Sequence, residues 1–391
     1  MISHLFKLIW NKKKQNFLLI TEMFVSFLVM FAVFTMIVRA YNNYRHPLGF
    51  EYDDVWVASY MTPENIQSDD SAALFQDVLR KQLQSFPQVV EAGFSGHNFP
   101  FAMTMSNSMV SSDQNEGVMT NFYNADDNYL KVLNAKMLSG RWFSKADDVS
   151  KSPVVVINRK LQEELFEGKN AIGKYIEYGG DRLKVIGVME NMKDKGTYTP
   201  VENGLFKRID AGAAKWTSNI LIKVKPGADA VFEGKLFKAL SNTIGTSVEI
   251  EHMDKKLTRQ NKLSLIPMII MLVVGGFLII NVALGLFGVL WYNINKRRSE
   301  IGLRRAVGAS GNSVSKQLVG ESLVLSTLAL LIGLFFAIQF PLLKVFDLPA
   351  SVYLVAIALS VAFIYILVFL CALYPGRQAA AIYPAVALHE E

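Results

Sequence analysis

The chain has 391 residues, of which 51% are hydrophobic and 19% are charged, and its mean hydropathy is +0.25. A soluble protein usually carries about 25% charged residues, so this composition favours a membrane protein. The net charge of +6 does not indicate nucleic-acid binding, because the polar part has no basic surface interleaved with aromatic residues. With one cysteine, Cys371, and five scattered histidines, the sequence offers no zinc cluster and no thiol chemistry.

Four apolar runs are each long enough to cross the hydrocarbon layer as a helix, which takes about 20 residues. They predict transmembrane helices at residues 17–38, 263–292, 318–340 and 352–374. The first run follows three lysines and could resemble a signal peptide. It is longer than the usual apolar core of about 7–15 residues and lacks a small-x-small cleavage site, so we interpret it as an uncleaved anchor.

The distribution of lysine and arginine predicts the orientation, since short loops rich in these residues stay in the cytoplasm. Lys12–Lys14 precede the first run, and six basic residues lie between the second and third runs. We therefore expect a multi-pass protein of the cytoplasmic (inner) membrane. Its expected segments are a cytoplasmic N-terminus (1–16), a periplasmic core domain (39–262), a cytoplasmic connector (293–317), a short periplasmic loop (341–351) and a cytoplasmic tail (375–391).

The large polar segment is predicted to be a mixed α/β domain. Two strand–helix–strand patterns, 55–60/71–86/89–94 and 219–224/228–240/247–252, predict split ferredoxin-like β-α-β units. Between them, residues 95–217 are predicted to form an inserted, mainly β subdomain with a hairpin around Gly179-Gly180-Asp181. Residues 103–117, rich in Ser, Asn and Met, are expected to form a mobile surface loop.

No catalytic or cofactor pattern emerges, so we expect a non-catalytic protein without a cofactor of its own. The stretch from Gly168 to Tyr175 imitates a phosphate-binding loop, but it is one residue short and ends in Tyr. It also follows a predicted helix and opens a strand, the reverse of the required order. The adjacent acids Asp126 and Asp127 are interpreted as residues of a solvated turn.

Two acidic residues fall inside apolar runs, where a charge usually indicates function. Glu22 and Glu321 lie near the predicted cytoplasmic face, so each is expected to reach water or to pair with a nearby Lys or Arg. No charge lies near the middle of a span. Together with only four spans and no repeat among them, this argues against a secondary transporter.

The connector between the second and third runs carries the most specific pattern. Residues 299–307 predict a short amphipathic helix that offers Ile301 and Leu303 to a partner, and Gly308 ends it. A second helical piece, 313–320, leads into the third run. A short basic helix of this kind can lie on anionic headgroups or dock in a groove of another protein. The residues alone leave both interpretations open.

This connector resembles the signature of the MacB/FtsX-like ABC permease family, R-x-x-E-I-G-[LI]-[RL]-[RK]-A-[LV]-G-A-[ST]. The tail from Tyr374 to Leu388 is similar to the family's ending, with Gly376 in place of the usual Ala, and 140–143 and 171–188 are similar to its periplasmic core domain. Span one departs from the family because it lacks a Gly-rich pattern. The connector positions that match are Arg297, Glu300, Ile301, Gly302, Arg304, Arg305, Ala306, Gly308, Ala309 and Ser310.

The resemblance implies a permease subunit that pairs with a separate cytoplasmic ATP-binding subunit and with a second permease, either a copy or a paralogue. ATP would bind to the partner, and its hydrolysis would move the periplasmic domain by mechanotransmission. Small residues allow close helix packing in lipid, and Gly275, Gly276, Gly285 and Gly288 would serve this in span two. The implied ATPase-coupling residues are Arg298, Glu300, Ile301, Gly302, Leu303, Arg304, Arg305 and Gly308.

Among activities compatible with this resemblance, the large inserted subdomain favours efflux or export through a periplasmic adaptor and an outer-membrane channel. The alternatives are a lipoprotein-releasing permease and an FtsX-like signalling module that controls a cell-wall hydrolase. A membrane-anchored binding protein without an ATPase is the least favoured. The sequence leaves the substrate and the choice between homodimer and heterodimer open.

Overall fold

The computed structural model describes residues 13–64, 66, 68–113, 115–149, 153–214 and 216–381. It divides into two compact units. One, called here the helical unit, comprises residues up to Asn42 and from Leu265 onward. The other, the globular domain, spans Asn43–Ser264. Most of the expected N-terminal segment 1–16, and the tail beyond 381, lie outside the described residues.

In the described residues, four helices are long and apolar enough to cross a membrane. The helix that contains the predicted fourth span, 352–374, continues through Pro375 and Gly376, both buried, to Ala380. Three short elements connect the long helices: α9 (Arg298–Ala306), α11 (Gln339–Leu342) and the 3-10 turn η2 (Val345–Asp347). The long helices are α2 (Lys13–Arg45), α8 (Met253–Lys296), α10 (Gly311–Ala337) and α12 (Ala350–Ala380).

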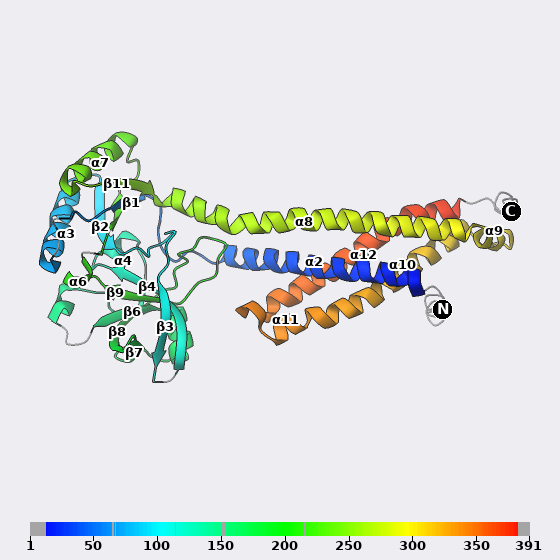
Figure 1. Ribbon diagram of the computed structural model, residues 1–391, viewed down its shortest axis with the longest axis horizontal. Coiled ribbons are helices and arrows are strands. Elements are labelled where there is room, and N and C mark those ends of the chain that lie inside the picture. Colours follow the sequence, from blue (N-terminus) through cyan, green and yellow to red (C-terminus); the bar gives the residue numbers. More distant parts are fainter. Residues whose placement is uncertain are drawn as a thin grey trace. The chain divides into compact units, whose positions relative to one another are not determined.

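The core of the helical unit is made by α2, α10 and α12, with a smaller contribution from α8. The helices α10 and α12 lie side by side as a hairpin closed by α11 and η2 (Figure 1). Phe27 of α2 is fully buried, and its ring occupies the space that a side chain at Gly333 of α10 would fill. By contrast, most of the apolar length of α8 is exposed.

One half of the globular domain is a four-stranded antiparallel sheet in the order β11–β1–β10–β2. Its helices, α3 (Asp69–Gln84) and α7 (Ala230–Ile244), cover one face (Figure 1). Since α3 joins β1 to β2 and α7 joins β10 to β11, this is the predicted ferredoxin-like arrangement of two β-α-β units. The strands are β1 (Val55–Tyr60), β2 (Val89–Ser95), β10 (Asn219–Val224) and β11 (Val248–His252).

Local sequence signals fix the ends of the two covering helices. Ser68 forms a capping box with Ser71 at the start of α3. Asp229 caps α7, and Gly245 ends it in a left-handed conformation with a φ of +72°. The strands then bury both faces by simple alternation: Trp56 packs under the helices, whereas Val57 packs into a second core shared with the inserted subdomain.

The inserted subdomain closes on itself. Six strands among the described residues follow one another as β4, β3, β7, β8, β6 and β9, and β9 returns to pair in parallel with β4. The helix α5 (Arg159–Phe166) shares one core with these strands. The strands are β3 (Asn107–Ser112), β4 (Asn115–Ala125), β6 (Val154–Asn158), β7 (Tyr175–Tyr178), β8 (Asp181–Met189) and β9 (Gly204–Arg208), with β5 (Met137–Gly140) added beside β8.

The expectation of a mobile loop at 103–117 was wrong. Residues 107–112 form β3, which pairs with β4 in a hairpin that places Met109 opposite Met119. The segment lacks a two-residue hydrophobic period because several of its side chains are exposed. Backbone pairing with a neighbouring strand therefore determines its structure, not burial of one face.

Two glycines of α10 provide a matched test of helix packing. A side chain at Gly333 would meet the Phe27 ring at 2.4 Å, whereas nothing lies within 4 Å of one at Gly320. We expect Gly333→Ala to destabilise the helical unit by about 1–3 kcal/mol through overpacking, and Gly320→Ala to be neutral or slightly stabilising. Thermal unfolding of both variants in the same detergent measures this, and equal midpoints would contradict it.

Candidate functional site

The connector between α8 and α10 folds back against the helix ends around it. The short helix α9 occupies it, and Gly308, with a φ of +102°, lets the chain turn after α9. The Ser310 side chain then accepts a hydrogen bond from the Ser313 N–H and caps α10. One small apolar core joins the pieces: Ile294, Ile301, Val314, Leu318 and Ala379.

A closed ring of polar side chains, called here the polar ring, fastens α9 to the first turns of α10. It consists of Arg297, Glu300, Arg304, Gln317 and Glu321. Two arginines donate to the Glu300 carboxylate, Arg297 at 3.0 Å and Arg304 at 2.6 Å. Arg304 also donates to Gln317 at 2.9 Å, Gln317 donates to Glu321 at 3.1 Å, and Arg297 pairs with Glu321 at 3.0 Å.

The ring satisfies every charge that it contains. Hydrogen bonding to Glu300 and the charges of both carboxylates raise the pKa of Arg297, although its partial burial acts the other way. The expectation that Glu321 pairs with a nearby basic residue is thereby confirmed. Networks of this kind hold two elements in one relative geometry, because breaking one member leaves another without its partner.

The C-terminal end of α12 closes the other side of the connector. The Arg305 side chain donates a hydrogen bond to the backbone carbonyl of Ala380. A side chain at Gly311 would meet that same carbonyl at 2.9 Å, so only glycine fits this close approach. The described part of the family-like ending, residues 374–381, thus contacts the family-like connector through Ala380.

The exposed face of α9 is smaller than the sequence suggested. Ile301 and Gly302 were expected to contact a partner. Ile301 is only 5% exposed and Gly302 is buried, so neither is available for such a contact. Leu303 and Val307 are 56% and 83% exposed. Arg304 lies beside them with its guanidinium about two-fifths exposed. The free surface is therefore an apolar pair flanked by charge, which is suited to docking in a partner's groove.

The four glycines of span two divide into two pairs. A side chain at Gly285 would meet the Glu22 carboxylate at 2.3 Å, and one at Gly275 would meet a valine of α2 at 3.3 Å. A side chain at Gly276 or Gly288 would meet nothing within 4 Å in the described structure. Among the described residues no Lys or Arg forms an ion pair with Glu22. The sequence did not single out Gly333, which is enclosed about as tightly as Gly285, since a side chain there would meet Phe27 at 2.4 Å.

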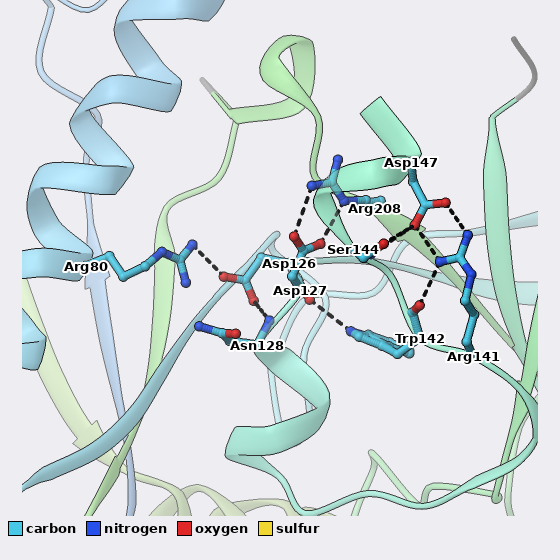
Figure 2. A network of polar contacts seen from close by, with 9 residues as sticks. All are labelled: Arg80, Asp126, Asp127, Asn128, Arg141, Trp142, Ser144, Asp147 and Arg208. Atoms are coloured by element: carbon cyan, nitrogen blue, oxygen red, sulfur yellow. Dashed lines mark hydrogen bonds and ion pairs between the residues drawn. The ribbon is translucent and has the colours of Figure 1, made fainter. Parts of the chain in front are cut away.

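The acids Asp126 and Asp127 were expected in a solvated turn. They lie where the chain turns after β4, but both are ion-paired and Asp126 is buried. Asp126 is buried and pairs with Arg80 of α3 at 2.9 Å, while Asp127 binds Arg208 at the end of β9 through two bonds of 2.7 and 3.0 Å (Figure 2). Burial raises the pKa of Asp126, against the opposing effect of Arg80. The Asp126 pair joins α3 of the ferredoxin-like half to the inserted subdomain, whereas the Asp127 pair lies within the inserted subdomain and links the ends of β4 and β9.

A third ion pair lies next to these acids. Arg141 binds Asp147 through two bonds of 2.7 and 2.5 Å, and the Ser144 N–H donates to the same carboxylate (Figure 2). These donors lower the pKa of Asp147. The Trp142 indole N–H donates to the Asp126 carbonyl and so links the two groups. We interpret the whole network as structural, because every acid in it is paired with an arginine.

The false phosphate loop follows α5 and leads into β7, in the order predicted from the sequence. Its Lys174 ammonium lies 5.1 Å from the centre of the Phe166 ring, and Lys169 pairs with Glu167. Both lysines thus have partners within the subdomain. Among the described residues no group of three or more His, Cys, Asp or Glu could hold a metal ion.

Sequence reasoning missed a buried lysine at the base of the globular domain. Lys193 is 1% exposed, and its ammonium donates to three backbone carbonyls, those of Asn43, His46 and Thr197, at 2.6, 3.2 and 2.6 Å. Burial lowers the pKa of Lys193 to about 8. Asn261 accepts from the Thr197 N–H, so one loop holds both ends of the domain. No sequence motif marks this lysine.

The comparisons with known proteins agree with this architecture. A model described as the MacB-like periplasmic core domain matches residues 24–232, and one described as the FtsX-like permease C-terminal matches residues 272–384. The chain belongs to the MacB/FtsX-like ABC transporter permease family. This confirms the family predicted from the connector and tail, and the predicted fold class is confirmed with it.

Individual relatives of this MacB/FtsX-like permease are distant. An uncharacterized ABC transporter permease, YknZ of Bacillus subtilis, is 25% identical over 54% of this chain and 54% of its own length. The macrolide export ATP-binding/permease protein MacB of Bdellovibrio bacteriovorus is 24% identical over 67% of this chain and 43% of its own length. The chain thus spans about half the length of these relatives, or less.

Solved structures show a weaker likeness. The periplasmic region of MacB from Actinobacillus actinomycetemcomitans is 16% identical with a TM-score of 0.38, and it covers 54% of this chain and 94% of that one. The extracellular domain of YknZ is 15% identical with a TM-score of 0.36, covering 50% and 99%.

The Arg80–Asp126 pair gives a test that depends on pH. Arg80→Met leaves a buried carboxylate without its partner, which costs about 3 kcal/mol at pH 7. When folding raises the pKa of a carboxyl group, the protein's free energy of unfolding falls as pH rises through that pKa. The deficit should therefore shrink toward about pH 4. Thermal unfolding at several pH values measures this loss of stability. Lys81→Met, a substitution at an exposed position of the same helix, is the control. A loss of stability that does not depend on pH would contradict the prediction.

The polar ring gives a second test. Glu321→Gln removes the charge that pairs with Arg297, so α9 should open more often from α10. We expect amide hydrogen exchange across 298–306 to be faster by about tenfold, corresponding to the loss of one charge-assisted bond of about 1.5 kcal/mol. Lys316→Gln, on an exposed position of α10, should leave exchange unchanged. Equal protection in both variants would show that the ring does not hold α9.

Proposed function

We propose that this chain is the permease subunit of an ABC transporter that works by mechanotransmission. ATP binding and hydrolysis by a separate cytoplasmic subunit would move α9, and the long helices would pass this movement to the globular domain. The observation that carries the proposal is the construction of the connector. The polar ring fastens α9 to α10, while Leu303 and Val307 stay exposed for a partner.

The proposed topology places both termini and the connector in the cytoplasm and the globular domain in the periplasm. The arginine-rich connector supports this assignment, and it puts α9 on the side where ATP is available. The permease itself would be non-catalytic and would bind no cofactor. A second permease, either a copy of this chain or a paralogue, would complete the complex.

The proposed task is efflux or export, through a periplasmic adaptor and an outer-membrane channel. Two observations support it: the closed inserted subdomain, which gives the domain a large surface for partners, and the printed name of the MacB relatives, macrolide export ATP-binding/permease protein. Lipoprotein release and control of a cell-wall hydrolase are the alternatives. Affinity purification in mild detergent separates them by the proteins that copurify: an adaptor, lipoproteins or a hydrolase.

Coupling through α9 has a direct test. In the double variant Glu300→Ala/Arg304→Ala, the ring is opened and the charge beside the exposed apolar pair is removed. We expect membrane insertion to be unchanged and the permease-dependent part of the partner's ATP hydrolysis to fall at least about fivefold, the lower end of typical coupling energies. The assay is ATP hydrolysis by the purified complex in nanodiscs, with Lys316→Ala as control.

Two single variants separate docking from transmission. Leu303→Glu changes only the exposed face, so it should prevent copurification of the ATP-binding subunit. Glu321→Gln changes only the ring, so the partner should still copurify while its hydrolysis no longer responds to the permease. Full activity and complex formation in the double variant would eliminate the proposed role of α9.

A further inference from the structure

A cavity of about 650 Å³, open on one side, lies in the helical unit along residues 24–39 of α2. Its size is typical of a site for a small organic ligand. The helices α2, α10 and α12 and the elbow formed by α11 and η2 line it. The coupling surface of α9 contributes nothing to it.

The cavity is long and chemically graded. One face of α2 lines it from Phe24 through Leu28, Phe31 and Met36 to Arg39. These positions span fifteen residues, or about 22 Å at 1.5 Å per residue. The wall is apolar over most of this length and becomes polar only near Arg39. An apolar space of this length fits an extended acyl chain.

The polar end of the cavity carries two side chains with hydrogen-bond donors that are available to a ligand. Arg39 is exposed, and neither its guanidinium nor the Gln339 amide makes a hydrogen bond or ion pair with another described residue. A guanidinium binds phosphate through paired, charge-assisted hydrogen bonds. Asp347 lies in the elbow between Phe346 and Leu348, which both line the cavity. An acidic group bordering a cavity that Arg39 also lines suits a zwitterionic headgroup.

The cavity has one firm wall and one strained wall. The firm wall is aromatic: the Phe31 ring lies 5.3 Å from that of Phe340 and 6.3 Å from that of Tyr353. The strained wall is the elbow, where Lys344, Phe346 and Asp347 all have positive φ, of 48°, 59° and 50°. Phe346 lines the cavity although it is 75% exposed. An occupant would contact Phe346 and hold the elbow against it.

We propose that this cavity binds a zwitterionic phospholipid, with one acyl chain along α2 and the phosphate held by Arg39 and Gln339. The lipid would come from the leaflet next to the globular domain, the outer leaflet in the proposed topology. The site goes beyond the proposed coupling to an ATPase and does not depend on it, since it uses none of the residues of α9 or the polar ring.

The test is native mass spectrometry of the full-length protein in detergent, titrated with palmitoyl-oleoyl phosphatidylethanolamine. Diacylglycerol with the same chains serves as the ligand without phosphate. We expect the wild type to bind the first phosphatidylethanolamine about tenfold more tightly than it binds diacylglycerol, as one charge-assisted contact allows. Arg39→Gln should abolish this preference, and Arg39→Lys should restore part of it.

Filling the cavity tests the acyl-chain part of the proposal. Ala32→Phe and, independently, Leu28→Trp place bulk within the apolar wall and should each weaken phosphatidylethanolamine binding about tenfold. Leu331→Phe, at an exposed position of α10 that does not line the cavity, should have no effect. Thermal unfolding confirms that each variant is folded, and two filling variants guard against the failure of one.

The outcomes separate clearly. Wild-type affinity in both folded filling variants would overturn the site, because the lipid would then lie on the outer surface of the helices. Equal binding of phosphatidylethanolamine and diacylglycerol to the wild type would overturn the role of Arg39. Neither result would bear on ATPase coupling, which is measured with α9 variants, so failure of one proposal is distinguishable from failure of the other.

Discussion

The pairing of the first and last strands of the globular domain is the constraint on which the architecture depends. β1 and β11 are hydrogen-bonded neighbours, with Trp56 opposite His252, and Met253 begins α8 directly after β11. The chain therefore enters and leaves the domain at one place. The buried Lys193 ammonium reinforces this base by binding carbonyls of Asn43 and Thr197. A domain closed in this way can be inserted between two membrane-crossing helices without disturbing its own sheet.

The same closure makes the domain suitable for transmitting movement. Its two halves share a core through alternate residues of β1, and the Arg80–Asp126 ion pair links α3 of the ferredoxin-like half to the inserted subdomain. Burial and pairing of charge of this kind are costly to disrupt. A displacement applied at the base of the domain would therefore reach the inserted subdomain as a whole instead of being absorbed between the two halves.

The helical unit has distinct chemistry at its two ends. At one end, the polar ring and the Arg305 contact with Ala380 hold α9 against α10 and α12. At the other, the strained elbow and Arg39 border an apolar cavity. In the proposed mechanism, the first end receives a movement from the ATP-binding partner. The phospholipid proposed for the second would fix the elbow against α2, so the α10–α12 hairpin would move as one body.

The four spans, the family and the ferredoxin-like half could be predicted from sequence alone, because each depends on a local signal. These signals are the length of the apolar runs, the connector motif and the hydrophobic periodicity, respectively. Only the tertiary structure showed that β9 closes onto β4, since strand pairing between distant segments leaves little local trace. It likewise showed that Ile301 is buried in a core and does not lie on the docking face. It showed that Asp126 and Asp127 pair with arginines, and that Gly333 is tightly packed whereas Gly276 and Gly288 are not. Which face of a helix is buried, and which charge is paired, depends on neighbours remote in the chain.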